Sequence, residues 1–203
     1  MSFIINGNHR FFSYDDIIEH LKNAKENTVK DIEITDISLT KRPLKEVLTL
    51  LKSQLESIKR MDFERTNLNG DDFKEIIIFL KTSHVQLDEL QLYCNDIKDE
   101  GVIVLYYEFK HIQVKKIGLG LNRITNRGMD DMINAFYLRP EEGYVETIDV
   151  QYNLFDDTIL EELNDDHLIS RIKRNPFEGL NHGNNFSYNR CLLFNKYNNN
   201  EEE

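Results

Sequence analysis

A pattern of apolar residues and one asparagine recurs along this chain, and it constrains the fold more than any other feature. The pattern is clearest in residues 87–101, LDELQLYCNDIKDEG. Its defining positions there are Leu87, Leu90, Leu92, Asn95 and Ile97. The same offsets return, starting at Val114, in VKKIGLGLNRITNRG. Recurrence at such a spacing predicts that the chain folds as successive copies of one small structural unit.

The full pattern, L-x-x-L-x-L-x-x-N-x-L, can be laid over five successive segments. These begin at Val29, Ile58, Leu87, Val114 and Val145, so the starts lie 29, 29, 27 and 31 residues apart. Further apolar residues follow the first four patterns at helical spacing. They are Val47, Leu51, Ile76, Leu80, Leu105, Phe109, Met132 and Phe136. Each unit is therefore predicted to be a short strand followed by a helix, and neither element can bury its apolar side without the next copy.

With this pattern the chain resembles the leucine-rich repeat family, specifically its ribonuclease-inhibitor-like subclass, whose long units carry a full α-helix. The resemblance covers about residues 29–163 and is complete in the third and fourth units, where N-x-I-x-D/N-x-G is present. Ile37 and Thr66 stand at the asparagine position of the first two units, and Pro43 and Asp72 at the glycine position. The resemblance implies an α/β solenoid, a right-handed superhelix of about five strand–helix units with strands inside the arc and helices outside.

The segments before and after the repeats are expected to cap the two ends, because a solenoid otherwise exposes its core and an unpaired strand edge. In residues 1–28, Asn6-Gly7 predicts a β-hairpin and Ser13 predicts the start of a helix. In residues 164–203, we expect the fifth helix to continue past Ile172. A strand around residues 191–194 and an acidic, asparagine-rich tail follow.

Three asparagines of the pattern, Asn95, Asn122 and Asn153, are expected to form a buried ladder. A side-chain amide carries both donors and an acceptor, so it can satisfy backbone groups where the chain turns out of a strand. Asp99, Asn126 and Asp157 stand at the matching position before each helix, where a short polar side chain caps free N–H groups.

The residues that the pattern leaves free within each strand should project together onto the concave face, because side chains alternate along a strand. We predict a partner-binding surface there, made by Arg60, Glu64, Glu89, Gln91, Tyr93, Lys116, Leu121, Asp149, Gln151 and Tyr152. Tyr93, Leu121 and Tyr152 have the character of an apolar anchor with a polar rim. Gly118 and Gly120 are expected to leave room for a partner's side chain. The alternative is that these are ordinary scattered surface tyrosines.

Charge and motif content narrow the function classes. The net charge of −11 disfavours nonspecific nucleic-acid binding, and it fits either a basic partner protein or simple solubility. The six histidines form no metal-binding spacing, and no nucleophile elbow or phosphate-binding loop is present. We therefore expect a binding protein without catalysis, cofactor or metal. No apolar run is long enough for a membrane span, and the N-terminal residues do not resemble a signal peptide. The two cysteines match no metal or redox spacing and suit a reducing compartment. We therefore expect a cytoplasmic protein.

Two alternatives stay open. Some ribonuclease-inhibitor-like solenoids activate small GTPases, and the resemblance implies that Arg60 or Arg65 could serve a G protein in this way. An arginine on a strand is more often half of a surface ion pair, here with Asp62 or Glu64. The terminal Glu201, Glu202 and Glu203 are also similar to the C-terminal signals of some secreted bacterial effectors that act on host proteins. A solvated acidic tail is the simpler interpretation.

Overall fold

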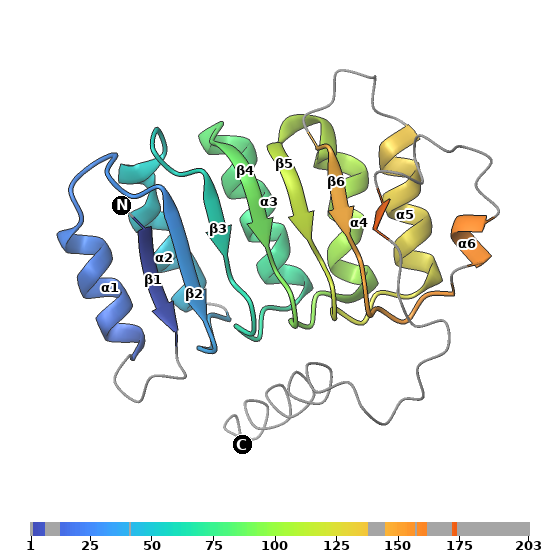
Figure 1. Ribbon diagram of the computed structural model, residues 1–203, viewed down its shortest axis with the longest axis horizontal. Helices are drawn as coiled ribbons and strands as arrows, with labels where there is room; N and C mark the ends of the chain where they lie inside the picture. The colour runs from blue at the N-terminus through green and yellow to red at the C-terminus, as the bar shows by residue number, and fades with distance from the viewer. Residues whose placement is uncertain are drawn as a thin grey trace.

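The protein is an α/β structure in which one parallel sheet alternates with helices along the chain (Figure 1). The computed structural model describes residues 2–6, 13–40, 42–137, 145–156, 158–161 and 172–173. In these residues the strands are β1 (Ser2–Asn6), β2 (Asp31–Thr35), β3 (Arg60–Asp62), β4 (Gln86–Gln91), β5 (Gln113–Gly118), β6 (Thr147–Asp149) and β7 (Ile172–Lys173). The helices are α1 (Tyr14–Asn23), α2 (Arg42–Leu51), α3 (Gly70–Ser83), α4 (Lys98–Glu108), α5 (Asn126–Tyr137) and α6 (Thr158–Glu161). Short 3-10 turns extend α2 (Lys52–Gln54) and α4 (Phe109–His111).

The strands pair strictly in chain order, β1 to β7, and every pair is parallel. One row of paired residues crosses the sheet through its interior: Ile32, Met61, Leu90, Ile117, Ile148 and Ile172. The first five come from successive repeats, and each occupies the same position of the sequence pattern within its repeat. All six are at most 4% exposed, and they belong to one continuous core shared with the helices.

All of this burial lies on one side of the sheet, because the helices α2 to α5 pack behind the strands (Figure 1). The apolar residues that recur in the helices, such as Val47, Ile76, Leu105 and Met132, are buried against the strand rows. The close approach of neighbouring helices requires glycine: a Cβ on Gly101 would lie 2.8 Å from the Cα of Gly70 in the preceding unit. No helix among the described residues covers the other side of the sheet.

The N-terminal segment extends the sheet. β1 pairs in parallel with β2, with Phe3 opposite Ile32 and Ile5 opposite Ile34, so the spacing of the repeats continues into the expected cap. Ser13 caps α1 as predicted, through a reciprocal pair of hydrogen bonds with Asp16. The second strand of the expected hairpin falls in residues 7–12, outside the described residues. The segment before the first repeat therefore contributes a strand and a helix arranged like those of the repeats.

At the other end, the prediction that Ile172 lies on a continued helix is wrong. Ile172 is buried in the short strand β7, which pairs with β6. Pairing satisfies backbone groups at the edge of β6, and this long-range gain overrides a local helical pattern. The remainder of the expected cap in 164–203, including the strand around residues 191–194 and the acidic tail, lies outside the described residues.

The asparagines of the repeat connect consecutive turns of the chain. Asn95 is fully buried, and its Oδ1 accepts hydrogen bonds from the backbone N–H groups of Thr66 and Leu68 at 3.1 and 2.9 Å. Its Nδ2 donates to the carbonyls of Phe63 and Leu92 at 2.9 and 3.0 Å. One side chain thus satisfies backbone groups of its own unit and of the preceding unit.

The same arrangement repeats at the next two asparagines. Asn122 donates to the carbonyls of Leu92 and Gly120 at 2.8 and 3.0 Å. Asn153 accepts from the N–H groups of Asn122 and Ile124 and donates to the carbonyl of Leu119. In the second unit Thr66 occupies this position, and its hydroxyl donates to the Phe63 carbonyl at 2.7 Å. The ladder therefore runs through the middle of the structure and ends where the asparagine is replaced.

The expectation that Asp99 and Asn126 cap their own helices is corrected by the structure. Asp99 lies inside the first turn of α4 and accepts hydrogen bonds from the N–H and hydroxyl of Thr125 in the next unit, at 2.8 and 2.6 Å. Asn126 likewise accepts from the N–H of Asp156 at 2.7 Å. These side chains hold the following unit, because its turn brings unpaired donors close to them. Asp157 lies outside the described residues.

Replacing Asn95 by alanine is expected to lower the free energy of unfolding by about 1 to 3 kcal/mol, because it leaves buried backbone groups without partners. The measurement is urea unfolding followed by circular dichroism. Asn134→Ala is the matched control, since Asn134 is exposed on α5. An equal effect in both variants would contradict a structural role for the ladder.

Candidate functional site

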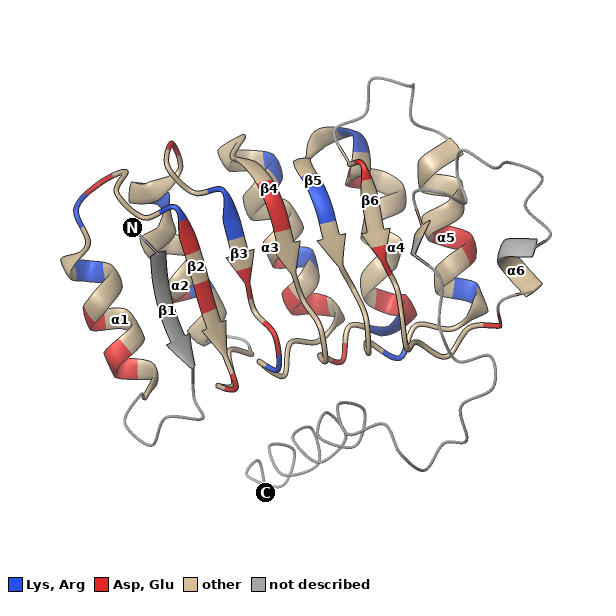
Figure 2. Ribbon diagram, viewed as in Figure 1, with Lys and Arg blue, Asp and Glu red and all other residues tan. Residues whose placement is uncertain are grey.

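We call the side of the sheet that the described helices leave uncovered the strand face; β2 to β6 and the turns that follow them form it (Figure 2). Strand pairing arranges these side chains in rows. The first row is Asp31, Arg60, Glu89, Lys116 and Thr147, and the second is Glu33, Asp62, Gln91, Gly118 and Asp149. Backbone hydrogen bonds beyond the strands extend the pairing to a third row, which contains Glu64, Tyr93, Gly120 and Gln151. Apart from Leu121 and Tyr152, every residue predicted for partner binding lies in these rows.

The first row alternates in charge from β2 to β5: Asp31, Arg60, Glu89, Lys116 (Figure 2). Opposite charges on neighbouring strands attract, whereas like charges directly opposite each other destabilise a sheet. The second row begins with two acids, Glu33 and Asp62, directly paired. The half of the strand face over β2 to β4 is consequently acidic, with arginine embedded in it.

Arg60 is the centre of this acidic half. Its guanidinium contacts Asp62 at 2.8 Å, Glu89 at 2.9 Å and Glu33 at 3.8 Å. One positive charge is thereby shared by three carboxylates on three strands. The arrangement holds the side chains of β2, β3 and β4 in register across the strand face.

Asp62 is the most buried acid of the cluster, with 6% of its surface exposed. Burial raises the pKa of Asp62 to about 6, Arg60 opposes this rise, and the charges of Glu33 and Glu89 add to it. One of its oxygens also accepts a hydrogen bond from the N–H of Glu64 at 3.1 Å. The Asp62 carboxyl therefore titrates just below neutral pH, where most aspartates are fully ionised.

Arg65 forms a second ionic group at the end of the same strand. Its guanidinium binds both oxygens of Asp36 and also contacts Glu64. Asp36 and Arg65 both have left-handed backbones, with φ of 60° and 54°. The candidate arginines Arg60 and Arg65 are thus each held by carboxylates.

A left-handed residue precedes the asparagine position in every repeat, a feature that sequence reasoning missed. The residues are Asp36, Arg65, Cys94, Leu121 and Tyr152, with φ between 56° and 61° except for Arg65 at 54°. The N–H groups of the first four continue the backbone pairing to the next unit, as when the Arg65 N–H donates to the Tyr93 carbonyl at 3.0 Å. Glycine is the usual residue at a positive φ, and none of these five residues is glycine, so residue type does not indicate the turn. Only the constant offset of these residues from the asparagine position could have indicated it.

The prediction that Gly118 and Gly120 leave room for a partner is wrong. A Cβ on Gly118 would lie 1.7 Å from Oε1 of Gln91, and a Cβ on Gly120 would lie 2.2 Å from the Tyr93 ring. The longer side chains of the preceding unit, Gln91 and Tyr93, lie across the two glycines. The space above Gly118 and Gly120 is occupied by the protein's own residues.

Tyr93 uses this space to reach across β5. Burial raises the pKa of the Tyr93 hydroxyl well above its usual range, and a hydrogen bond to Asp149 raises it further. The phenol therefore stays protonated and connects the third unit to the fifth. Tyr93 is half-buried, so it offers less free surface than the sequence suggested.

The expectation that Leu121 is an exposed anchor is also corrected. Leu121 is 7% exposed and packs with Cys94 and the half-buried Tyr152 in a small apolar cluster. The left-handed turn tips these three side chains toward one another. Cys94 is disulfide-bonded, against the expectation of reduced thiols, and the chain's other cysteine, Cys191, lies outside the described residues.

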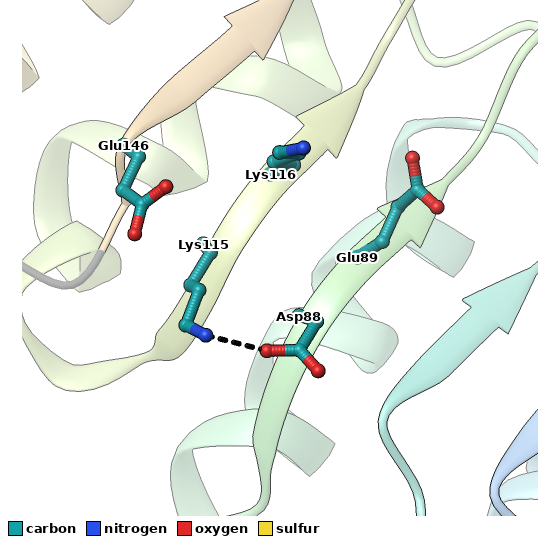
Figure 3. Close-up of a pocket in the computed structure, with 5 residues that line it drawn as sticks. All are labelled: Asp88, Glu89, Lys115, Lys116 and Glu146. Carbon is teal, nitrogen blue, oxygen red and sulfur yellow. Dashed lines mark hydrogen bonds and ion pairs between the residues drawn. The ribbon is translucent and has the colours of Figure 1, made fainter.

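A shallow hollow of about 340 Å³ lies at the start of β4, β5 and β6 (Figure 3). Its lining is entirely charged: Asp88, Glu89, Lys115, Lys116 and Glu146. Lys115 and Asp88 form an ion pair of 2.6 Å. Within the described residues, Lys116 is exposed and has no ion-pair partner within 4.0 Å, and no group of His, Cys, Asp or Glu is arranged to hold a metal ion. Lys116 thus contributes an exposed positive charge to the lining of the hollow.

Gly120→Ala is expected to destabilise the fold by about 1 to 3 kcal/mol, because the added methyl group displaces the Tyr93 ring. The same substitution should cost much less when Tyr93→Ala is already present. A double-mutant cycle of unfolding free energies tests this coupling. Strictly additive effects would contradict the packing of Tyr93 over Gly120.

The pKa of Asp62, about 6 against 3.8 for an ordinary aspartate, has a consequence for stability. Between these values the folded state binds more protons than the unfolded state, so Asp62 lowers stability as pH rises, by at most about 1.4 kcal/mol per pH unit. Asp62→Asn should remove that contribution between about pH 4 and 6. Urea unfolding of both proteins across this range checks it, and identical pH profiles would contradict the raised pKa.

No helix among the described residues combines the length and apolar character needed to cross a membrane. Comparisons of the chain with models of known protein families and with curated proteins found no match. The functional conclusion for this protein therefore depends on the geometry and charge of its strand face.

Proposed function

We propose that this chain is a leucine-rich-repeat solenoid that binds another protein on the concave strand face, without catalysis of its own. The observation that carries the proposal is the contrast between the two sides of the sheet. On one side the strands are buried by helices in a continuous core. On the other, rows of half-exposed polar side chains stand at fixed positions on a rigid sheet. Such a surface suits recognition, because its groups are already ordered before a partner arrives.

The chemistry of the strand face favours a protein over a small molecule. Small-molecule sites are mostly apolar and enclose their ligand, with a few polar groups fixing its orientation. The hollow over β4 to β6 is lined only by charged residues. Electrostatic complementarity of this kind sets partner choice and association rate in protein interfaces.

The net charge of the chain, −11, supports the choice of a protein over a nucleic acid. The repeat spacing, the asparagine ladder and the chain-order parallel sheet support the leucine-rich-repeat assignment. Activation of a small GTPase by Arg60 or Arg65 is not proposed. A catalytic arginine must reach the transferred phosphoryl group, and both guanidinium groups are occupied by carboxylates here.

A tryptophan placed on the strand face is expected to block partner binding. Lys116→Trp adds bulk at an exposed position of β5. Affinity capture from cell extract with quantitative mass spectrometry should show proteins retained by the unaltered chain and reduced by about tenfold, or 1.4 kcal/mol, on this variant.

The matched control is Lys110→Trp, the same exchange at an exposed position on the helix side. It should retain the same proteins as the unaltered chain. Equal capture by both tryptophan variants would place partner binding away from the strand face.

A further inference from the structure

The acidic half of the strand face has more negative charge than its own arginines neutralise. Arg60 is surrounded by Glu33, Asp62 and Glu89. Arg65 is bound by two further carboxylates, those of Asp36 and Glu64. Five acids therefore face two guanidinium groups over β2, β3 and β4. The ionised groups of this cluster sum to 2 − 5 = −3, and this excess negative charge would stabilise an additional cation.

Three of these acids are accessible to a partner. The side chains of Glu33, Glu89 and Glu64 are 28%, 31% and 36% exposed. They are also partly desolvated, so a docking cation interacts with them more strongly than with carboxylates fully surrounded by water. Glu33 is on β2, Glu89 is on β4, and Glu64 lies in the turn after β3. The pairing of Arg60 with Glu89 holds β3 and β4 in register.

Lys116 is a second and independent feature of the same face. Its ammonium group is exposed in the first row, beside the charged hollow, and has no ion-pair partner within 4.0 Å among the described residues. β5 is two strands from β3, which places Lys116 about 10 Å from Arg60 across the sheet. A surface with excess acid at one end and an unpaired cation at the other is dipolar.

The remaining part of the face is less open to a partner's side chains. Gln91 lies over Gly118, and Tyr93 lies over Gly120 and binds Asp149. A partner's charged groups can therefore reach the strand face at two places, where the charged side chains of the rows are exposed. These are the carboxylates over β2 to β4 and the ammonium group on β5.

We infer that the strand face receives an extended segment of the partner protein in which a Lys or Arg docks among Glu33, Glu64 and Glu89 while an Asp or Glu reaches Lys116. This inference rests on the proposed function and specifies the partner's chemistry. An extended chain advances about 3.3 Å per residue, so the two charged residues lie two to four positions apart. The order of the basic and acidic residues in the segment sets the direction in which the segment crosses the sheet.

Protonation of Asp62 opposes this docking. The groups that face Asp62 are Arg60 on its own strand, Glu33 on β2, Glu89 on β4, and Arg65. A cation docked among them favours the ionised carboxylate. Binding of the segment is therefore weaker at pH 5, below the Asp62 pKa of about 6, than at pH 7.5.

The test is selection of peptides from a random library on the full chain, followed by fluorescence anisotropy with the most enriched labelled peptide. The selected peptides should contain Lys or Arg with Asp or Glu two to four positions away. Glu33→Gln with Glu64→Gln should weaken binding by about tenfold, because two of the docking carboxylates are lost. Glu100→Gln with Asp130→Asn is the control, since it removes the same charge from exposed positions on α4 and α5 and should leave affinity unchanged.

A charge exchange makes the test specific. Lys116→Glu should weaken binding of the selected peptide, and replacing the acidic residue of the peptide by lysine should restore it. Equal losses in the control pair, selection of peptides without basic residues, or failure of this rescue would overturn the inference.

The two proposals fail differently. If Lys116→Trp blocks the selected peptides and the charge variants bind normally, the strand face is the binding site and the charged docking is wrong. If the selected peptides bind Lys116→Trp and the charge variants unchanged, both proposals are overturned.

Discussion

The fold depends on how the backbone leaves each strand, and in the third, fourth and fifth units one side-chain amide satisfies the backbone groups of that turn. At the end of a strand the chain turns away from the sheet and would leave buried carbonyl and N–H groups unpaired. Asn95 meets this requirement by accepting from two N–H groups of the preceding unit and donating to carbonyls of both units. Asn122 and Asn153 repeat the arrangement. The ladder therefore joins each of these three units to the one before it through buried hydrogen bonds.

The same turn explains the character of the strand face. The residue before each asparagine position is left-handed, and its side chain lies toward the equivalent residue of a neighbouring unit. In the acidic half this brings Arg65 onto Asp36, and in the other half it buries Leu121 against Cys94 and Tyr152. One backbone geometry thus produces an ionic group at one end and an apolar cluster at the other. The difference comes only from which residue types the repeat leaves unspecified.

The repeat spacing predicted most of the architecture. The five strands, their order and their buried rows follow from apolar residues at constant offsets, because equivalent positions must stack when copies of one unit pack together. The strand face could be located by alternation alone, and Arg60, Glu89 and Lys116 lie in one row as expected. The roles of Tyr93 and Leu121 could not be predicted in this way. Whether a side chain on a face is free or covered depends on its neighbours in the adjacent units, which lie a full repeat away in the sequence.

The sequence by itself determined the α/β class, the unit length and the residues that face the core, since these depend on periodicity within one unit. Only the tertiary structure decided that β1 and β7 extend the sheet, because strand pairing at its ends is a long-range interaction that local patterns do not encode. It also decided that Gly118 and Gly120 are covered by Gln91 and Tyr93, and that Asp62 carries a raised pKa. These properties arise from contacts between units, where distance, burial and charge act together.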